Sequence, residues 1–492
     1  MNCVKCRAEL PKGALYCHMC GKKQVPEKRK ALKRSNGTGT VYKLQGRRRR
    51  PWVAAKNRVV IGYYEKMKEL ESIYNSFLAG SRITTDSREV KTGDIFIALK
   101  GENHNGNTFA EKAVAQGAKH VVIDEAAYNT APQCVLVPDT LQFLQQLANH
   151  HRRKLNIPIL GITGTNGKTT TKELCHAVLS KKYNTVATKG NLNNHIGVPL
   201  TLLSMDASTE FGIVEMGANH PGEIKELCKI VEPDYGIITN IGYAHLEGFG
   251  SYENIIQTKR ALYESVKEKS GILFVNGEDK LLCQLSEGQK RYTYGIDGHF
   301  TNGEIVQTTP YLVYALKTHH GQLYIRTKLI GGYNFDNAMA ATTVGTYFNI
   351  DPLQIQAAIE AYTPSNLRSQ LLKTERNTII LDAYNANPSS MQVAISNFGE
   401  MKADNKLLII GEMRELGAIS EESHKNIVEL MKKNNFPRVF LVGSIANNYT
   451  FTRYFPDTDT LIEYLKANEI RHAFILIKGS RGNKLERITE YL

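Results

Sequence analysis

Short apolar runs alternate with longer amphipathic stretches along most of this chain. In its middle part the runs are PILGIT, FGIVEM, YGIITNI and GILFVN, which begin at Pro158, Phe211, Tyr235 and Gly271. Such runs lack the polar alternation of a half-exposed strand, so they predict strands that are buried on both faces of a parallel sheet. The helical stretches between them would cover that sheet. The expected fold class is α/β, with a central domain over residues 154–365.

The same alternation flanks the central part on both sides. The runs DIFIALKG, KHVVID and CVLVP predict a small α/β domain over residues 67–153, with an amphipathic start at Met67. The runs NTIILDAY, KLLIIGEM, RVFLVGS and AFILIKGS predict a third, Rossmann-like domain over residues 366–492. A chain of 492 residues is long enough for three domains of ordinary size.

Composition and charge set the N-terminal segment apart. The formal net charge is +14, yet residues 1–64 alone contain 17 Lys and Arg against Glu9 and Glu27. The rest of the chain is close to neutral, so the basicity says nothing about the main body. A basic segment of this kind often contacts nucleic acid or another polyanion. No apolar run is long enough to span a bilayer and none near the N-terminus resembles a signal peptide, so we expect a cytoplasmic protein.

The cysteines divide in the same way. The motifs CVKC and CHMC provide two C-x-x-C pairs, formed by Cys3, Cys6, Cys17 and Cys20. Four thiolates at this spacing suit a tetrahedral Zn²⁺ ion and predict a zinc ribbon over residues 1–24. Two redox pairs are the alternative, but they would normally accompany an α/β framework. The remaining cysteines are scattered and predict buried thiols in a reducing compartment: Cys134, Cys175, Cys228 and Cys283.

A basic β-rich segment is predicted over residues 25–66. The stretch GTGTVYKLQGRRRRPWVAAKNR alternates and carries turn signals, which favours short strands over a helix. Arg47, Arg48, Arg49 and Arg50 would lie on phosphate while Trp52 packs on the sheet. The stretch resembles the small arm-binding domain at the start of some tyrosine recombinases, which implies a nucleic-acid partner. A solvated basic tail is an equally good interpretation, and no recombinase catalytic domain follows.

The run GITGTNGKTTTKE, from Gly161 to Glu173, follows a buried strand and predicts a phosphate loop. Its G-x-x-G-K-T spacing is shorter than the general G-x-x-x-x-G-K-[ST] pattern, and is more informative because it is less common. Backbone N–H groups of the turn and the next helix would surround an anion. Lys168 would add a positive charge for the β- and γ-phosphates, and the Thr169 hydroxyl would reach Mg²⁺.

Two further polar side chains follow neighbouring buried strands. Glu215 ends FGIVEM and His245 follows YGIITNI. Both should emerge at the carboxyl ends of parallel strands, where open α/β sheets place their ligands. With Thr169, they would hold Mg²⁺ between phosphate oxygens. Taken singly, Glu215 could be a surface carboxylate and His245 a hydrogen-bonded core residue.

Motifs that follow one another in order resemble the Mur ligase family. They are GTNGKTTTKE, TKGNLNNHIGVPL, EMGANHPGEI, NIGYAHLEGFGSYENIIQTK, GGYNFDNAMAA, LDAYNANPSSM and KGSRGNKLE. DAYNANP is most similar to the MurF branch, and Thr169 and Thr170 stand where folylpolyglutamate synthetases typically carry Gly-Ser. The resemblance covers residues 67–492. It implies a three-domain architecture with a central P-loop sheet and a Rossmann-like C-terminal domain.

The resemblance also implies a reaction. MurF enzymes join D-Ala-D-Ala to UDP-MurNAc-tripeptide in peptidoglycan precursor synthesis. A carboxylate has a poor leaving group, so ATP first converts it to an acyl phosphate that an amine can attack; such a transfer needs charge neutralisation above all. Another Mur ligase, a folylpolyglutamate synthetase-like ligase, and a DNA-binding protein with a ligase-like body remain as alternatives.

The family's functional residues can be carried over to matching positions. The implied catalytic set is Lys168, Glu215, His245 and Lys259. Lys259 matches a family lysine that CO₂ converts to a carbamate, which then binds Mg²⁺. The alternative is that Lys259 is an ordinary lysine on a helix surface. The implied ATP-binding set is Gly164, Thr165, Asn166, Gly167, Lys168, Thr169, Thr170, Asn334, Asn337, Arg368 and Asp382. Asn334 and Asn337 could instead cap a helix, and Arg368 and Asp382 could form structural ion pairs.

Substrate-binding residues are implied in all three domains. Ser87 and Arg88 would contact the uridine part, with Asp86 as a turn cap. Asn193 and Asn194 would contact the sugar–peptide part, or simply stabilise their loop. Asn385 and Asn387 would lie near the incoming dipeptide. The role of Arg414 is left open, and Tyr333 stands where the family often has His.

Overall fold

The structure is a computed structural model that describes residues 32–33, 40–43, 52–56 and 59–492, apart from 102–103, 365–366 and 444–451. The four cysteines of the predicted zinc ribbon and Arg47 to Arg50 lie outside the described residues. The zinc site and the nucleic-acid contact therefore stay predictions from sequence. The chain divides into two compact units, Met1–Thr140 and Leu141–Leu492, which are described separately.

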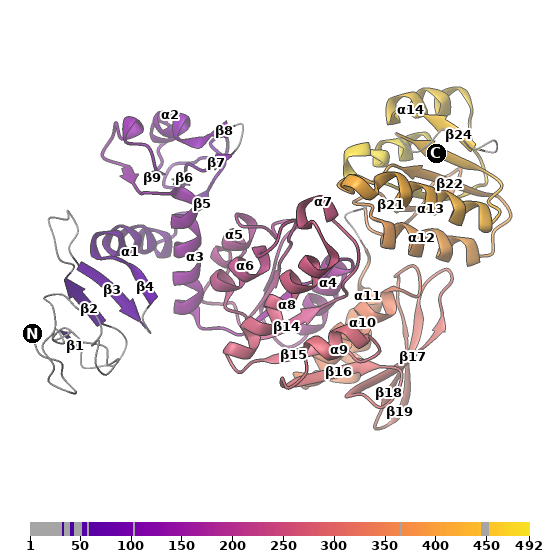
Figure 1. The fold of residues 1–492 in the computed structure, drawn as a ribbon, viewed down its shortest axis with the longest axis horizontal. Coiled ribbons are helices and arrows are strands. Elements are labelled where there is room, and N and C mark those ends of the chain that lie inside the picture. Colours follow the sequence, from indigo (N-terminus) through magenta and orange to yellow (C-terminus); the bar gives the residue numbers. More distant parts are fainter. Residues whose placement is uncertain are drawn as a thin grey trace, which may run out of the picture. The chain divides into compact units, whose positions relative to one another are not determined.

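The N-terminal unit begins with an antiparallel sheet in simple sequence order (Figure 1). Its strands are β1 (Leu32–Lys33), β2 (Thr40–Lys43), β3 (Trp52–Lys56) and β4 (Val59–Tyr63). The short strands predicted for the GTGTVYKL and RPWVAAKNR stretch are thus present. Helix α1 (Tyr64–Leu78) follows β4 without a break, so the domain boundary predicted between residues 66 and 67 falls inside this helix.

A second, parallel sheet completes this unit, in the order β10-β9-β6-β5. Its strands are β5 (Ile83–Thr84), β6 (Ile95–Ile97), β9 (His120–Ile123) and β10 (Cys134–Leu136). Between β6 and β9 lie the small pair β7 (Lys100–Gly101) and β8 (His104–Asn105), and helix α2 (Ala110–Ala115). Phe96, Ala110 and Val121 pack in one core cluster, which joins the sheet to α2.

The second unit contains the large central sheet, in the order β12-β13-β11-β14-β15-β16-β17-β18-β19. Strands β11 (Ile159–Thr163), β13 (Phe211–Glu215), β14 (Tyr235–Ile238) and β15 (Ile272–Asn276) are the four predicted from apolar runs. They pair in parallel, and β11, β13 and β15 are buried along their whole length. Burial on both faces explains why these strands show no alternation in sequence.

The pattern did not predict the remaining strands of this sheet. They are β12 (Thr185–Ala187), β16 (Arg291–Gly295), β17 (Thr301–Gln307), β18 (Val313–Thr318) and β19 (Gly321–Arg326). β17, β18 and β19 pair antiparallel at one edge. Their mixture of exposed and buried residues produces no apolar run, because an edge extension has a solvent-facing side.

Helices cover this sheet in two groups. The first consists of α4 (Lys168–Leu179), α10 (Asn334–Tyr347) and α11 (Pro352–Ala361), which pack on one another and on the sheet. The second consists of α5 (Gly197–Leu203), α6 (Glu223–Val231) and α8 (Tyr252–Glu268). Shorter helices are α7 (Leu246–Phe249) and α9 (Lys280–Leu285), and α3 (Thr140–Leu155) precedes β11.

The C-terminal part of the second unit has a sheet in the order β20-β21-β25-β22-β23-β24. Its strands are β20 (Gln370–Lys373), β21 (Thr378–Asp382), β22 (Lys406–Gly411), β23 (Val439–Val442), β24 (Thr452–Phe455) and β25 (Phe474–Lys478). All pair in parallel except β20. This arrangement agrees with the parallel sheet expected for a Rossmann-like domain.

Both faces of this C-terminal sheet carry a core. In β22, Leu408 and Ile410 join a cluster with α12 (Pro388–Glu400) and α13 (Ser420–Lys433), while Leu407 and Ile409 join a cluster with α14 (Thr458–Ala467). Alternate residues of a strand point to opposite faces, so an uninterrupted apolar run supplies both layers.

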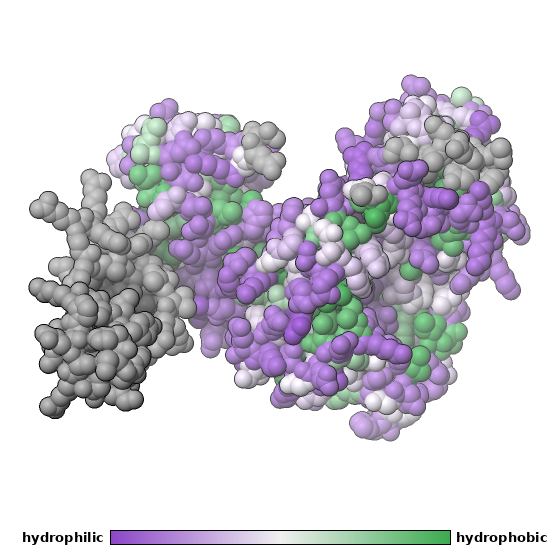
Figure 2. Space-filling view, viewed as in Figure 1, coloured by the Kyte–Doolittle hydropathy of each residue, from purple (hydrophilic) through white to green (hydrophobic). Residues whose placement is uncertain are grey.

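The described surface is mostly polar. On the face drawn in Figure 2, hydrophilic residues cover most of the described surface. Within the described ranges, no helix has both the length and the apolar character needed to cross a membrane.

The four described cysteines are free thiols. Cys175 and Cys228 are buried as predicted, and burial raises the pKa of Cys228 to about 12, whereas Cys134 and Cys283 are partly exposed.

A buried arginine fastens α3 to the central sheet. The Arg152 Nε donates to the carbonyl of Val231 at 2.9 Å, and its Nη2 donates to Asp234 Oδ2 at 2.7 Å. The same carboxylate oxygen accepts from the Ile159 backbone N–H at 2.9 Å. One guanidinium therefore ties α3 to the first residues of β11 and β14.

We expect Arg152→Ala to lower the free energy of unfolding by about 2 kcal/mol, because the Val231 carbonyl and the Asp234 carboxylate both lose a buried donor, while Lys269 still pairs with Asp234 at 2.6 Å. The neighbouring Arg153 side chain is 59% exposed and pairs with Glu232 at the surface, so Arg153→Ala is the matched control with an effect below about 1 kcal/mol. Urea unfolding followed by circular dichroism would measure both. Equal effects of the two substitutions would contradict the role assigned to Arg152.

Candidate active site

The phosphate-loop motif forms the predicted strand–turn–helix. β11 ends at Thr163 and α4 begins at Lys168. Gly164 has φ of 149° and Gly167 has φ of 77°. A Cβ at Gly164 would lie 1.9 Å from Thr239 Oγ1, and one at Gly167 would lie 2.4 Å from Asn337 Oδ1. Both positions therefore need glycine, for conformation and for space.

A neighbouring segment holds the turn in shape. The Asn166 backbone N–H donates to Asn240 Oδ1 at 3.0 Å, and the Asn166 carbonyl accepts from Asn240 Nδ2 at 3.1 Å and from Thr239 Oγ1 at 2.6 Å. The Thr165 N–H donates to the Asn240 carbonyl at 2.9 Å. Asn240 was missed as a site residue, although it lies in the quoted run YGIITNI. Its position as a polar residue after a buried strand was the available signal.

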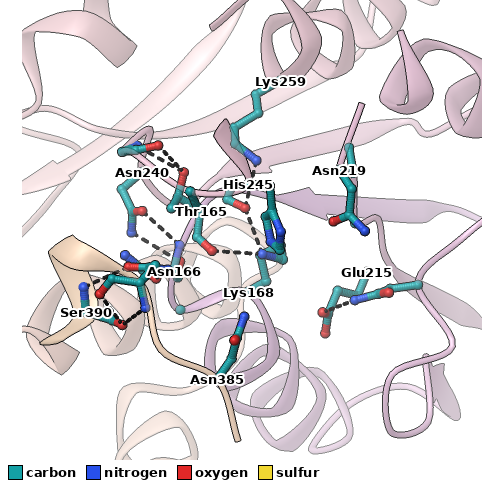
Figure 3. Close-up of a pocket in the computed structure, with 18 of the residues that line it drawn as sticks. Thr165, Asn166, Lys168, Glu215, Asn219, Asn240, His245, Lys259, Asn385 and Ser390 are labelled. Atoms are coloured by element: carbon teal, nitrogen blue, oxygen red, sulfur yellow. Dashed lines mark hydrogen bonds between the residues drawn. The ribbon is translucent and has the colours of Figure 1, made fainter. Parts of the chain in front are cut away.

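Two lysine amines meet at the turn. Lys168 Nζ and Lys259 Nζ both donate to the Gly164 carbonyl, at 2.8 Å and 2.9 Å, and Lys259 is only 4% exposed (Figure 3). Burial lowers the pKa of Lys168 to about 8, opposed by Glu215 and assisted by Arg368. Burial, and then the charge of Lys168, hold the pKa of Lys259 well below its usual value. The arrangement concentrates positive potential and favours a neutral amine at Lys259.

A buried carboxylate faces the start of α4. Glu215 is 1% exposed; its Oε2 accepts from Thr169 Oγ1 at 2.9 Å and its Oε1 accepts from Asn193 Nδ2 at 2.8 Å. The buried Lys172 amine lies 3.9 Å from Oε2 and donates to the Thr188 carbonyl at 2.7 Å. A hydroxyl and a carboxylate placed side by side are oxygen donors of the kind that Mg²⁺ prefers. Sequence reasoning missed Lys172. It lies in the quoted loop motif, but the motif gives no indication of its contact with Glu215, which is far away in the sequence.

His245 lies at the same cavity but has a partner of its own. It adopts φ of 52° immediately before α7, and its Nδ1 contacts the Glu415 carboxylate from the C-terminal part. Burial lowers the pKa of His245, although Glu415 opposes this, and the charges of Lys168 and Lys259 lower it further. The residues that the structure describes contain no group of three or more His, Cys, Asp or Glu placed to hold a metal ion.

The predicted residues of the second unit converge on one cavity of about 1210 Å³. Figure 3 shows Lys168, Lys259, Glu215 and His245 pointing into it from different elements. Other predicted residues that line it are Gly164, Thr165, Asn166, Gly167, Thr170, Asn193, Asn194, Asn334, Asn337, Arg368, Asp382, Asn385 and Asn387. Thr169 is connected to the cavity by its hydrogen bond to Glu215, which lines it.

Side chains of the C-terminal part enter this cavity. The Arg368 guanidinium lies 3.9 Å from the centre of the Tyr384 ring, and its Nε is buried without a hydrogen-bond partner. Asp382 accepts from the almost fully buried Lys478 at 2.6 Å. Lys478 was missed in sequence, though it is a polar residue that ends the apolar run AFILIK. The Asn385 Oδ1 accepts from the adjacent Ala386 N–H at 2.9 Å, and the Asn385 carbonyl accepts from Lys478 Nζ at 3.4 Å.

Asn334 and Asn337 form a relay between α10 and α4. Thr171 Oγ1 donates to Asn337 Oδ1 at 3.0 Å, Asn337 Nδ2 donates to Asn334 Oδ1 at 2.9 Å, and Asn334 Nδ2 donates to the Ile330 carbonyl at 2.8 Å. Neither residue caps α10, because Tyr333 occupies the cap position. Their role in ATP binding stays a prediction.

The remaining substrate residues make local contacts. Asn194 Oδ1 accepts from the backbone N–H groups of Ile196 and Gly197 at 3.1 and 2.9 Å, as the loop-stabilising interpretation expects. In the N-terminal unit, Ser87 is buried and Arg88 is 82% exposed, with its Nη2 2.5 Å from Asp86. The Asp86 carboxylate also accepts from the Arg88 N–H, and these hydrogen bonds lower the pKa of Asp86 below its usual value. A role in uridine binding stays a prediction.

Comparison with known proteins shows the family to which the chain belongs. Family models match in three consecutive segments: Mur ligase family, catalytic domain, over residues 81–152; Mur ligase middle domain, over residues 162–345; and Mur ligase, glutamate ligase domain, over residues 367–481. These segments lie inside the three predicted α/β domains. The glycine turn, the lysines and the buried carboxylate described above all belong to the middle segment.

Individual relatives align with most of the chain. The UDP-N-acetylmuramoyl-tripeptide–D-alanyl-D-alanine ligase of Bacillus subtilis is 34% identical over 424 residues, which are 83% of this chain and 92% of the relative. The crystal structure of MurF from Acinetobacter baumannii matches with a TM-score of 0.77 and 28% identity, over 85% of this chain and 97% of that one. MurF ligase from Thermotoga maritima, solved in complex with ADP, matches over the same shares with a TM-score of 0.75 and 26% identity. The chain therefore belongs to the Mur ligase family and, within it, to the group of UDP-N-acetylmuramoyl-tripeptide–D-alanyl-D-alanine ligases.

Proposed function

We propose that this protein joins D-Ala-D-Ala to UDP-MurNAc-tripeptide with hydrolysis of ATP to ADP and phosphate, as a cytoplasmic step of peptidoglycan precursor synthesis. The observation that carries the proposal is the meeting of Lys168, Lys259 and Glu215 around one glycine turn, in a chain of this family. The Thermotoga maritima relative binds ADP, which supports a nucleotide at the corresponding loop.

The loop residues suit the phosphates of ATP. Backbone N–H groups at the start of α4 and the Lys168 amine would face the β- and γ-phosphates. Arg368, whose Nε is buried without a partner, would gain one from a phosphate oxygen. Asn334, Asn337 and Asp382 line the same cavity and would contact adenine and ribose.

The proposed reaction has two steps. An oxygen of the tripeptide's terminal carboxylate attacks the γ-phosphorus, the bond to ADP breaks, and an acyl phosphate forms. The amine of D-Ala-D-Ala then attacks the acyl carbon, phosphate leaves, and the nitrogen loses a proton. Lys168 and Arg368 would neutralise charge on the transferring group, which is the main requirement of phosphoryl transfer.

A Mg²⁺ ion fits the donor set beside the loop. Thr169 and Glu215 would hold it, with His245 and a carbamate at Lys259 as the further ligands, and it would supply charge neutralisation of the phosphate oxygens. Oxygen ligands already converge there, and Lys172 and Asn193 fix the Glu215 carboxylate. Mg²⁺ commonly takes few protein ligands and completes its shell with water and phosphate, so a small set is sufficient.

Carbamylation of Lys259 is part of the proposal. A lysine reacts with CO₂ only as the neutral amine, giving a carbamate and releasing a proton. Burial and the neighbouring Lys168 favour that neutral form. The product would place an anion beside the Lys168 amine, where that positive charge would stabilise it.

The substrate contacts that the sequence resemblance implies are also part of the proposal. Ser87 and Arg88 would contact the uridine part, Asn193 and Asn194 the sugar–peptide part, and Asn385 the incoming dipeptide. Substrate pieces bound on separate domains would be brought together for the reaction.

A substrate-omission assay tests the ligase activity. We expect phosphate release from ATP and Mg²⁺ only when UDP-MurNAc-tripeptide and D-Ala-D-Ala are both present, with product identified by mass spectrometry. Lys168→Ala should lower kcat by on the order of a hundredfold, because the charge on the transferring phosphoryl group loses its partner. Phosphate release that ignores D-Ala-D-Ala, or that requires folate or another amino acid instead, would favour one of the alternative ligases.

Chemical rescue tests the carbamate. We expect Lys259→Ala to lower kcat by on the order of a hundredfold, and a short carboxylic acid to restore part of it by supplying the missing oxygen ligand. Arg260→Ala is the matched control, since this neighbour is 43% exposed and pairs with Glu264 on the helix surface. Full activity of Lys259→Ala without added acid would exclude a role for the carbamate.

We also propose that Cys3, Cys6, Cys17 and Cys20 bind zinc. Four thiolates at this spacing should hold about one ion per chain. We expect elemental analysis of the purified protein to find this zinc, and the double substitution Cys3→Ser, Cys6→Ser to remove it without loss of ligase activity. A zinc content that the substitutions leave unchanged would refute the site.

A further inference from the structure

The side chain of Asn166 in the phosphate loop is engaged by the C-terminal part of the chain. Asn166 Nδ2 donates to Ser389 Oγ at 2.8 Å, and Asn166 Oδ1 accepts from Asn387 Nδ2 at 2.9 Å. Asn387 lies 221 residues away in sequence. Figure 3 shows Asn166 next to the start of α12, where Ser390 is labelled. Both polar atoms of this amide are therefore used in one contact.

The main chain of Asn166 serves a different purpose. Its N–H and carbonyl bind Asn240, which fixes the shape of the glycine turn. One residue thus belongs to two networks, one that shapes the loop and one that reaches α12. Displacement of one network should displace the other, because both are attached to one residue with a short side chain.

The partner at α12 is held in a defined orientation. Asn387 caps the helix: its Oδ1 accepts from the Ser390 N–H at 2.8 Å and from Ser389 Oγ at 2.9 Å. Because the cap needs the oxygen on that side, the Asn387 nitrogen must face the loop. The capping box is completed by Ser390 Oγ, which hydrogen-bonds to the Asn387 main chain, whereas the Asn166 side chain hydrogen-bonds to Ser389 and Asn387.

We propose that Asn166, Asn387 and Ser389 form a docking contact that couples the conformation of the phosphate loop to the position of the C-terminal domain. They are positioning residues. In this arrangement Asn387 Oδ1 accepts two hydrogen bonds and one N–H of its Nδ2 binds Asn166, so the contact with the dipeptide that was predicted from sequence would have only the second N–H to use. The inference rests on the proposed ligase function for its consequence in catalysis, but the contact itself does not depend on it.

The contact has a mechanistic consequence. A loop ordered around phosphate presents Asn166 in the position that α12 binds, so occupancy of the loop and docking of the C-terminal domain stabilise each other. The His245–Glu415 contact joins the same two parts on another side of the cavity. The domain proposed to carry the amine substrate would then be brought to the loop in the state that holds nucleotide.

The kinetic test compares neighbouring serines of α12. Ser389→Ala removes the acceptor of Asn166 Nδ2, whereas Ser390→Ala weakens the cap of the same helix without touching the loop. We expect Ser389→Ala to lower kcat about five- to tenfold, as for the loss of one or two hydrogen bonds, with a smaller change in the KM for ATP. Ser390→Ala should stay within about twofold of the wild type. Equal losses in the two variants would overturn the inference.

A double-mutant cycle in kcat separates docking from independent effects. If Asn166 and Ser389 act through one contact, Asn166→Ala combined with Ser389→Ala should be little worse than Asn166→Ala alone. Losses that multiply would show that the two residues act separately, and would contradict the proposal.

Hydrogen–deuterium exchange of the ligand-free protein gives a readout that does not need ligase activity. We expect Ser389→Ala to speed exchange in a peptide covering residues 163–169, and Asn166→Ala to speed it in one covering 385–392, each about fivefold. Ser390→Ala should affect only the second peptide. If this reciprocal response is found while the wild type fails the substrate-omission assay, the docking contact stands and the proposed function falls. If Ser389→Ala leaves the loop peptide unchanged, the docking contact falls whatever the enzyme does.

Discussion

The carbonyl oxygen of Gly164 accepts hydrogen bonds from two lysine amines, and the rest of the site is arranged around that shared acceptor. Lys168 comes from the first residue of α4 and Lys259 from the interior of α8, so both helices must lie against the end of β11. Burial lowers the pKa of both amines, and the charge of Lys168 lowers the pKa of Lys259 further. A phosphate, or a carbamate at Lys259, would offset that cost of burial. The fold therefore places the Lys168 charge where a bound anion would stabilise it.

Two glycines and an asparagine make this convergence possible. Gly164 and Gly167 leave no room for a Cβ, and Asn240 binds the turn from the next strand in the sheet. The same turn then presents the Asn166 side chain to α12. Anion binding, loop shape and the approach of the C-terminal domain thus share a few hydrogen bonds, which gives a physical reason for the middle and C-terminal segments to belong to one chain.

Sequence reasoning worked best for features that depend on residues close together in the chain. The buried strands β11, β13, β14 and β15 were visible as apolar runs, since a strand covered on both faces has no polar alternation. The glycine turn was recognised from its spacing. The edge strands β17 to β19 were not found, because their half-exposed residues form no run. The helix boundary at Tyr64 was also not apparent, as β4 passes directly into α1.

The sequence by itself determined the elements, the phosphate loop and the family, because these depend on residues close together in the chain and on ordered motifs. Only the tertiary structure decided which side chains meet. Lys172 with Glu215, Glu415 with His245, and Asn387 with Asn166 are pairs from separate motifs, and no spacing encodes them. Asn387 illustrates the difference: its residue type suits a substrate amide or a helix cap equally well. Packing of α12 against the loop committed its oxygen to the cap and its nitrogen to Asn166, since a buried amide must satisfy both ends.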